Sequence, residues 1–193
     1  QGKKVKAKGI QVCERSVNEA HVAERVAINV SSIEKDEIER GNVLCTPGIF
    51  MPTRDIDVSL TLLAEEKQQR IKVLFDHGAR EVSAQVTLFT DKKQTFAHLR
   101  LEKPIFCAAG DSFIIRRFSP VFTIGGGNVL DPFGKKAKKK FFEQKIQELE
   151  ILERSSRAER ISMVVKQADV GVRIHEVQQK LLLPIPDIRH EIS

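Results

Sequence analysis

The spacing of apolar residues divides this chain into two parts. Up to about residue 118, apolar and polar side chains alternate over short runs, a period typical of β-strands with one buried face. From residue 142 onward, apolar residues recur every three or four positions, which predicts amphipathic helices. Between the two patterns lies the stretch RRFSPVFTIGGGNVLDP at 116–132. The sequence therefore predicts a mainly β protein with an α C-terminal part.

The first fifty residues contain few strand signals. We expect strands at 4–13 and 25–30, a loop at 14–24 between them, and a last short strand at 43–45. Two or three strands cannot close a barrel, because their edges stay unpaired and they bury little area. We therefore interpret residues 1–50 as part of a β-barrel whose other strands lie upstream of Gln1.

In residues 51–132, apolar and polar residues again alternate, and here they form enough strand-length runs for a complete domain. The runs are 58–62, 71–75, 82–88, 97–101, 112–115 and one that begins after Ser119. Short strands at regular spacing without helices between them indicate a sandwich or a barrel. A closed barrel of about six strands explains best why so few strands would have an exposed apolar edge.

Helical stripes dominate residues 133–193. The stripes are Phe142, Ile146, Leu149 and Leu152; Ile161, Val164, Val165 and Ala168; and Ile174, Val177 and Leu181. Pro186 suits the first turn of a further helix that carries Ile188 and Ile192. Two short helices joined by a proline-containing turn predict a helix-turn-helix unit, and the chain ends inside its second helix.

Charge changes this picture only at the C-terminal part. The net charge is +6, and residues 134–193 hold four of these six positive charges. Much of the excess is one run of lysines: Lys135, Lys136, Lys138, Lys139 and Lys140. Such a run favours phosphate backbones through counterion release, but it is equally typical of a solvated linker. Both interpretations stay open at this point.

Several classes of protein are disfavoured by the sequence. No apolar run is long enough to cross a bilayer, and the lysine-rich start lacks the apolar core of a signal peptide, so we expect no membrane partner. The three cysteines are expected to be small buried thiols. Neither a catalytic carboxylate pair nor a metal cluster can be assembled, and Gly125-Gly126-Gly127 has no following lysine that would make it a phosphate loop. We interpret these glycines as a tight crossing where the barrel strand leaves for the linker.

Six segments carry a resemblance to a known family. LEKP at 101–104, AGDSFIIRRFSP at 109–120 and TIGGGNVLDP at 123–132 resemble the SelB family, the selenocysteine-specific translation elongation factors of bacteria. GIQV at 9–12, AERVAINV at 23–30 and ERGNVL at 39–44 resemble the second half of that family's domain 2, which EF-Tu shares in outline. The resemblance implies three parts, which are a partial domain 2 barrel at 1–50, a domain 3 barrel at 51–132, and a basic linker with a partial winged helix at 133–193.

The same resemblance implies a function for the parent protein. The family binds GTP and Mg in an N-terminal domain and carries selenocysteinyl-tRNA on domains 2 and 3. On the ribosome, its last winged helices grip an mRNA hairpin beside a recoded UGA. The resemblance also implies a cytoplasmic, monomeric protein whose parent would be a translational GTPase. The sequence has no Gly-x-x-x-x-Gly-Lys-Ser/Thr motif, so we expect the fragment to be no enzyme and to hold no cofactor itself.

Candidate site residues follow from the resemblance and from the local pattern. The resemblance implies that Arg25 contributes to the aminoacyl pocket, and an arginine solvated at the barrel rim is the alternative. Arg116 and Arg117 are neighbours on a strand, so at most one of them faces a bound tRNA. His77 is expected in a hairpin turn, with an RNA backbone contact as the alternative, and His98 is expected at an exposed strand position.

A second class of protein fits the same pattern without the resemblance. A basic β-barrel followed by a helix-turn-helix unit is also typical of a regulator that binds duplex DNA. Preferential binding of palindromic DNA over tRNA would select this alternative.

Overall fold

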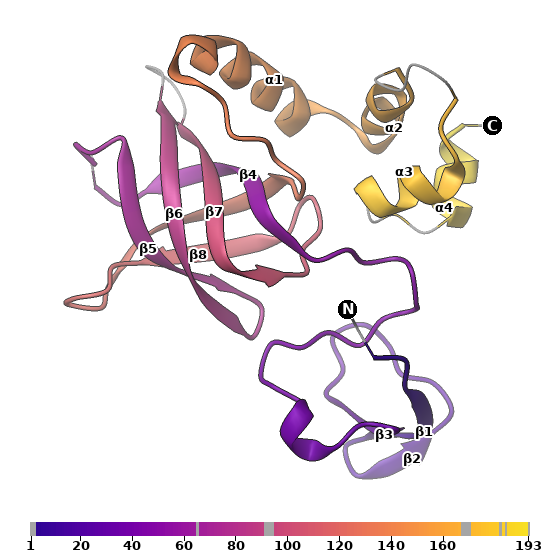
Figure 1. Cartoon of the computed structure of the whole chain (residues 1–193). Helices are drawn as coiled ribbons and strands as arrows, with labels where there is room; N and C mark the ends of the chain where they lie inside the picture. Colours follow the sequence, from indigo (N-terminus) through magenta and orange to yellow (C-terminus); the bar gives the residue numbers. More distant parts are fainter. Residues whose placement is uncertain are drawn as a thin grey trace. The chain divides into compact units, whose positions relative to one another are not determined.

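The computed structural model describes residues 3–64, 66–90, 95–166, 171–181, 183 and 185–192. Residues 1–42 and 43–193 form two separate compact units. Figure 1 shows that strands make up the first unit and the start of the second, and that helices follow them along the chain. The predicted fold class, mainly β with an α C-terminal part, is confirmed.

The first unit is a small antiparallel sheet with strand order β2-β1-β3. Its strands are β1 (Lys6–Val12), β2 (Arg15–Val17) and β3 (Val26–Ser31), and a short 3-10 helix, η1 (Lys35–Glu37), follows them. The turn between β1 and β2 has positive φ at both central residues, Cys13 and Glu14, as a two-residue type I′ hairpin requires.

Two predictions for the first fifty residues are wrong. The segment expected to be a loop contains β2, because the hairpin turn places Arg15 opposite Val12. The strand expected at 43–45 is irregular, and Val43 and Leu44 are 46% and 54% exposed. The segment belongs to neither sheet, so its apolar residues lie in an irregular and exposed stretch.

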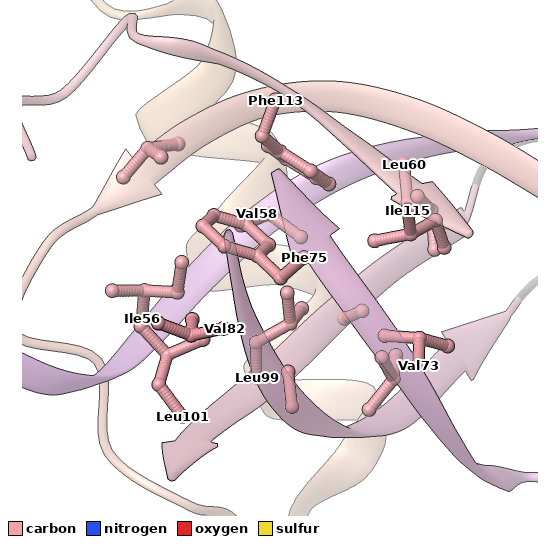
Figure 2. Packing of buried hydrophobic residues seen from close by; sticks show 14 of the residues in the cluster. Ile56, Val58, Leu60, Val73, Phe75, Val82, Leu99, Leu101, Phe113 and Ile115 are labelled. Atoms are coloured by element: carbon pink, nitrogen blue, oxygen red, sulfur yellow. The ribbon is translucent and has the colours of Figure 1, made fainter. Parts of the chain in front are cut away.

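The second unit begins with a closed six-stranded barrel in the order β4-β7-β6-β5-β8-β9. The strands are β4 (Thr53–Leu62), β5 (Arg70–His77), β6 (Arg80–Thr90), β7 (Thr95–Ile105), β8 (Ser112–Arg116) and β9 (Thr123–Asp131). Alternate side chains point inward and form one apolar core, in which Phe75 stacks on Phe113 (Figure 2). The predicted barrel of about six strands is confirmed, and the turn region at 91–94 lies outside the described residues.

Gly125, Gly126 and Gly127 lie within β9, the strand that closes the barrel between β8 and β4. A Cβ on Gly125 would lie 2.5 Å from the Thr61 carbonyl oxygen, and one on Gly126 would lie 2.7 Å from that of Phe113. A Cβ on Gly127 would overlap the Ser59 carbonyl oxygen. The predicted close approach is therefore confirmed, but its expected place is wrong, because the glycines belong to the body of the strand and not to its exit.

Helix α1 (Phe142–Arg154) covers part of the barrel's outer surface after a 3-10 turn, η2 (Lys139–Phe141). Leu149 of the predicted apolar stripe is fully buried against Phe89, Phe96 and Leu130, which point outward from the barrel strands. These three barrel residues are buried only because the helix lies over them. Burial of each such side chain contributes about 1.5–3 kcal/mol.

Three further helices share a second small core. They are α2 (Arg157–Lys166), α3 (Ile174–Leu181) and α4 (Ile185–Glu191), and they bury Ile161, Val164, Val177 and Ile188. Ser156 and Glu159 form a capping box before α2, and Pro186 lies in the first turn of α4 as predicted. Ala168, expected at the end of the second stripe, lies outside the described residues. None of the helices in the described ranges is both long and apolar enough to cross a membrane.

The cysteines differ from expectation. Cys13 and Cys45 are exposed, and only Cys107 is buried. Burial, together with the nearby charges of Asp111 and Asp131, raises the pKa of the Cys107 thiol to about 12. The prediction of three buried thiols holds for Cys107 alone, because Cys13 lies in the exposed β1–β2 hairpin turn and Cys45 in an irregular segment.

Candidate nucleic-acid interface

Arg116 is held by acidic side chains of the β5–β6 hairpin. Its Nε donates to Asp76 Oδ2 at 2.6 Å and its Nη2 donates to Asp76 Oδ1 at 3.0 Å, a bidentate pair. Nη2 also donates to Glu81. Hydrogen bonding to Asp76 and the charges of both carboxylates raise the pKa of Arg116. This arginine therefore links β8 to the neighbouring hairpin.

Arg117 lies beyond the end of β8 and is the more exposed of the two, with 49% of its side chain accessible against 30% for Arg116. Its Nη2 donates to Glu66 Oε2 at 2.7 Å, and its guanidinium lies 5.9 Å from the ring centre of Phe122. One ion pair on an accessible arginine is weak. Of the two arginines, Arg117 can exchange its partner more easily for a phosphate.

His77 lies at the end of β5, beside a hairpin turn in which Gly78 has a φ of +54°. The histidine ring is stacked on Phe75, and its Nε2 lies 3.0 Å from Asp111 Oδ2. Hydrogen bonding to His77, followed by the donation from the Ala108 N–H, lowers the pKa of Asp111 against the opposing effect of burial. The predicted turn is confirmed, and the ring of His77 joins that turn to the loop before β8.

Arg25 directly precedes β3 in the first unit, and its side chain is exposed. An exposed arginine at a strand end can bind an anionic group by charge-assisted hydrogen bonds. Its assignment to an aminoacyl pocket stays a prediction.

The five lysines of the run at 135–140 are all exposed. Together with the end of β9 and the first turns of α1, this run forms an open groove of about 670 Å³, which we call the lysine groove. Its walls include Lys135, Lys136, Lys138 and Phe141 on the linker side, and Lys145 and Glu148 on α1. The run is therefore the wall of a concave surface as well as a linker.

A buried polar cluster beneath the lysine groove was missed by the sequence interpretation. Asp57 is fully buried, and its Oδ1 lies 2.9 Å from His98 Nδ1, while Asp55 Oδ1 lies 3.2 Å from His98 Nε2. The Lys145 ammonium lies 2.7 Å from Asp57 Oδ2, an ion pair made outside hydrogen-bond geometry. Gly134 packs directly over this carboxylate, where a Cβ would lie 2.5 Å from Asp57 Cγ.

The predicted exposure of His98 is therefore wrong, since the residue is only 2% exposed. The alternation along β7 was interpreted correctly, because His98 does point out of the barrel, opposite Asp57 in register. Helix α1 and Gly134 then cover that outer surface. Two sequence features could have indicated this buried cluster. They are the two aspartates at alternate positions of one strand and a lysine, Lys145, beside the apolar stripe of the helix.

Large parts of the chain are similar to known proteins. Residues 53–136 match the family model described as "Selenocysteine-specific elongation factor, beta-barrel domain". A curated relative, the selenocysteine-specific elongation factor of Desulfomicrobium baculatum, is 33% identical over 147 residues, which cover 72% of this chain and 23% of the relative. The chain thus spans about a quarter of that relative's length.

Two solved structures resemble the chain in fold. A bacterial selenocysteine-specific elongation factor, EF-Sec, superposes with a TM-score of 0.71 at 18% identity, covering 92% of this chain and 28% of the other. The apo form of elongation factor SelB from Methanococcus maripaludis gives a TM-score of 0.58 at 20% identity, covering 70% and 35%. At these identities the likeness concerns the fold alone.

Proposed function

The chain belongs to the SelB family through its barrel domain, and from this we propose that it is part of a selenocysteine-specific elongation factor that positions selenocysteinyl-tRNA for UGA recoding. The match of the barrel at residues 53–136 carries the proposal. That range contains both arginines and the glycine-rich strand on which the resemblance rests. The role is non-covalent binding.

The remaining parts of the process belong to the parent protein under this proposal. A nucleotide-binding domain outside this sequence would bind GTP and Mg, and further winged helices would bind the mRNA hairpin on the ribosome in the cytoplasm. The three-helix core of α2, α3 and α4 would then connect the barrel to those helices, and its interpretation as part of a winged helix stays a prediction.

The candidate residues differ in exposure and in their bonding partners, and we propose a different role for each. Arg117, which is accessible and held by a single carboxylate, is proposed to contact the tRNA backbone. Arg116, with its bidentate partner, is proposed to hold β8 in place. Arg25, exposed before β3, is proposed to meet the aminoacyl group.

The test measures binding of this chain to labelled selenocysteinyl-tRNA, to the same tRNA carrying serine, and to a palindromic DNA duplex. We expect the selenocysteinyl form to bind most tightly. Arg117→Gln should weaken tRNA binding about 3- to 10-fold, the usual cost of one charge-assisted contact. The matched control is Arg100→Gln, which removes an exposed arginine from β7.

Two results would contradict the proposal. Tighter binding of the DNA duplex than of either tRNA would favour the regulator alternative. Equal losses for Arg117→Gln and Arg100→Gln would remove Arg117 from the tRNA contact.

A further inference from the structure

We propose that the lysine groove binds unpaired nucleotides of an RNA, with phosphates at Lys135, Lys136 and Lys138 and a base stacked on Phe141. The choice of RNA as the partner rests on the proposed function. The groove is separate from the arginines of β8, and its contribution can be measured independently of theirs.

Charge is the first argument. Some cations elsewhere on the barrel lie in ion pairs, as Lys72 does with Glu102 and Arg117 with Glu66. Among the described residues, no carboxylate lies within ion-pair distance of the three lysines that line the groove. The carboxylates of the groove are already engaged, since Asp131 Oδ1 accepts from the Phe133 N–H at 2.8 Å and Glu148 lies 3.8 Å from Lys145. Three cations therefore remain available for an anionic ligand.

The second argument is the aromatic side chain among these lysines. Phe141 lines the groove and is 46% exposed, although an apolar ring gains from burial. The Lys140 ammonium lies 4.8 Å from the centre of its ring. An exposed ring among cations is the arrangement that proteins use to bind single-stranded nucleic acid, because every base offers a face for stacking.

The groove is also held in shape before any ligand binds. One wall is α1, which is fixed to the barrel by Leu149 and by the buried ion pair of Lys145 with Asp57. The other wall follows β9 and is fixed by Ala137, which packs in the same cluster as Leu149. A preformed groove spares a ligand part of the ordering cost of binding.

A single strand fits this groove better than a duplex. In an A-form duplex the bases are paired and stacked on one another, so a protein meets phosphates, 2′-hydroxyls and base edges but no face of a base. Such a ligand would use the lysines and leave Phe141 without a partner. A strand with unpaired bases can place its phosphates at the lysines and the face of a base on Phe141.

The experiment measures fluorescence anisotropy of this chain with a labelled single-stranded RNA of eight nucleotides and with a hairpin duplex, over a series of salt concentrations. Three variants are compared: Lys135→Ser/Lys136→Ser/Lys138→Ser, Phe141→Leu, and the control Arg54→Ser/Lys67→Ser/Lys103→Ser. The control removes the same charge from exposed barrel positions. Thermal unfolding of each variant verifies that it is folded.

The salt slope is the slope of the logarithm of the binding constant against the logarithm of the salt concentration. Each phosphate contact to a single strand contributes ~0.7 to its magnitude, so we expect the groove triple variant to reduce it by about 2 and the control to leave it nearly unchanged. Phe141→Leu should weaken single-strand binding at least about fivefold and leave duplex binding unaltered. Equal losses in both triple variants, no effect of Phe141→Leu, or tighter binding of a polyglutamate peptide than of RNA would overturn the proposal.

Failure of the groove proposal can be distinguished from failure of the proposed function. If the groove proposal fails, the preference for selenocysteinyl-tRNA and the effect of Arg117→Gln stay as they are. If the proposed function fails, that preference is lost while single-strand binding in the groove is unaffected.

Discussion

At the scale of single residues, the carboxylate of Asp111 connects segments that are far apart in sequence. It accepts from the Ala108 N–H at 2.8 Å and lies 3.0 Å from the ring of His77, 34 residues away. These bonds stabilise its charged form and lower its pKa in the folded state. The unfolded chain lacks them, so the pKa of Asp111 returns there to about 4.

This difference predicts a contribution to acid stability. The contribution is fully present above about pH 4 and is lost as the pH falls through the lower, folded-state pKa. Asp111→Asn should therefore lower the free energy of unfolding at pH 6, by less than about 1 kcal/mol because the side chain is 39% exposed. The deficit should shrink as the pH falls below about 4. Urea unfolding from pH 2 to pH 7 measures it, with the exposed Asp36→Asn as a control; a deficit at pH 2 as large as the one at pH 6 would contradict this account.

At the scale of elements, β9 can close the barrel only with glycines at its centre. The backbones of β8 and β4 approach on either side, and the carbonyl oxygens of Ser59, Thr61 and Phe113 occupy the space of the missing side chains. Glycine ordinarily weakens a strand interior. Here the lack of a Cβ is what permits the sixth strand to pair.

Gly127→Ala should therefore destabilise the barrel by about 2 kcal/mol or more, since its Cβ meets backbone that cannot yield as a side chain can. Gly171→Ala is the matched control, because a Cβ there would meet nothing within 4 Å. Thermal unfolding followed by circular dichroism compares the two. Equal stabilities of the two variants would show that the barrel can open to accept the methyl group.

At the scale of the whole molecule, the two compact units differ in their cores. The barrel encloses one continuous apolar cluster (Figure 2), whereas none of the described residues in 3–42 is buried. A three-stranded sheet without a buried core is only marginally stable in water. The first unit is therefore the part of the chain with the lower local stability.

Amide hydrogen exchange should show this difference directly. We expect the amides of β1 and β3 to exchange at least about 100-fold faster than the central amides of β4 and β7, because local opening costs less where little apolar area is buried. Mass spectrometry after timed exchange measures both sets in one sample. Equal protection in the two units would contradict this prediction.

The sequence by itself determined that a β part is followed by a helical part, since period two and period three to four reflect local backbone geometry. It also determined the family, through 101–132, and the position of Pro186 in a helix start. The tertiary structure decided what α1 covers: His98 became buried, Phe89 and Phe96 gained a second core, and Lys145 met Asp57. Burial on the outer surface of a barrel depends on an element from elsewhere in the chain, and alternation along a strand carries no information about it.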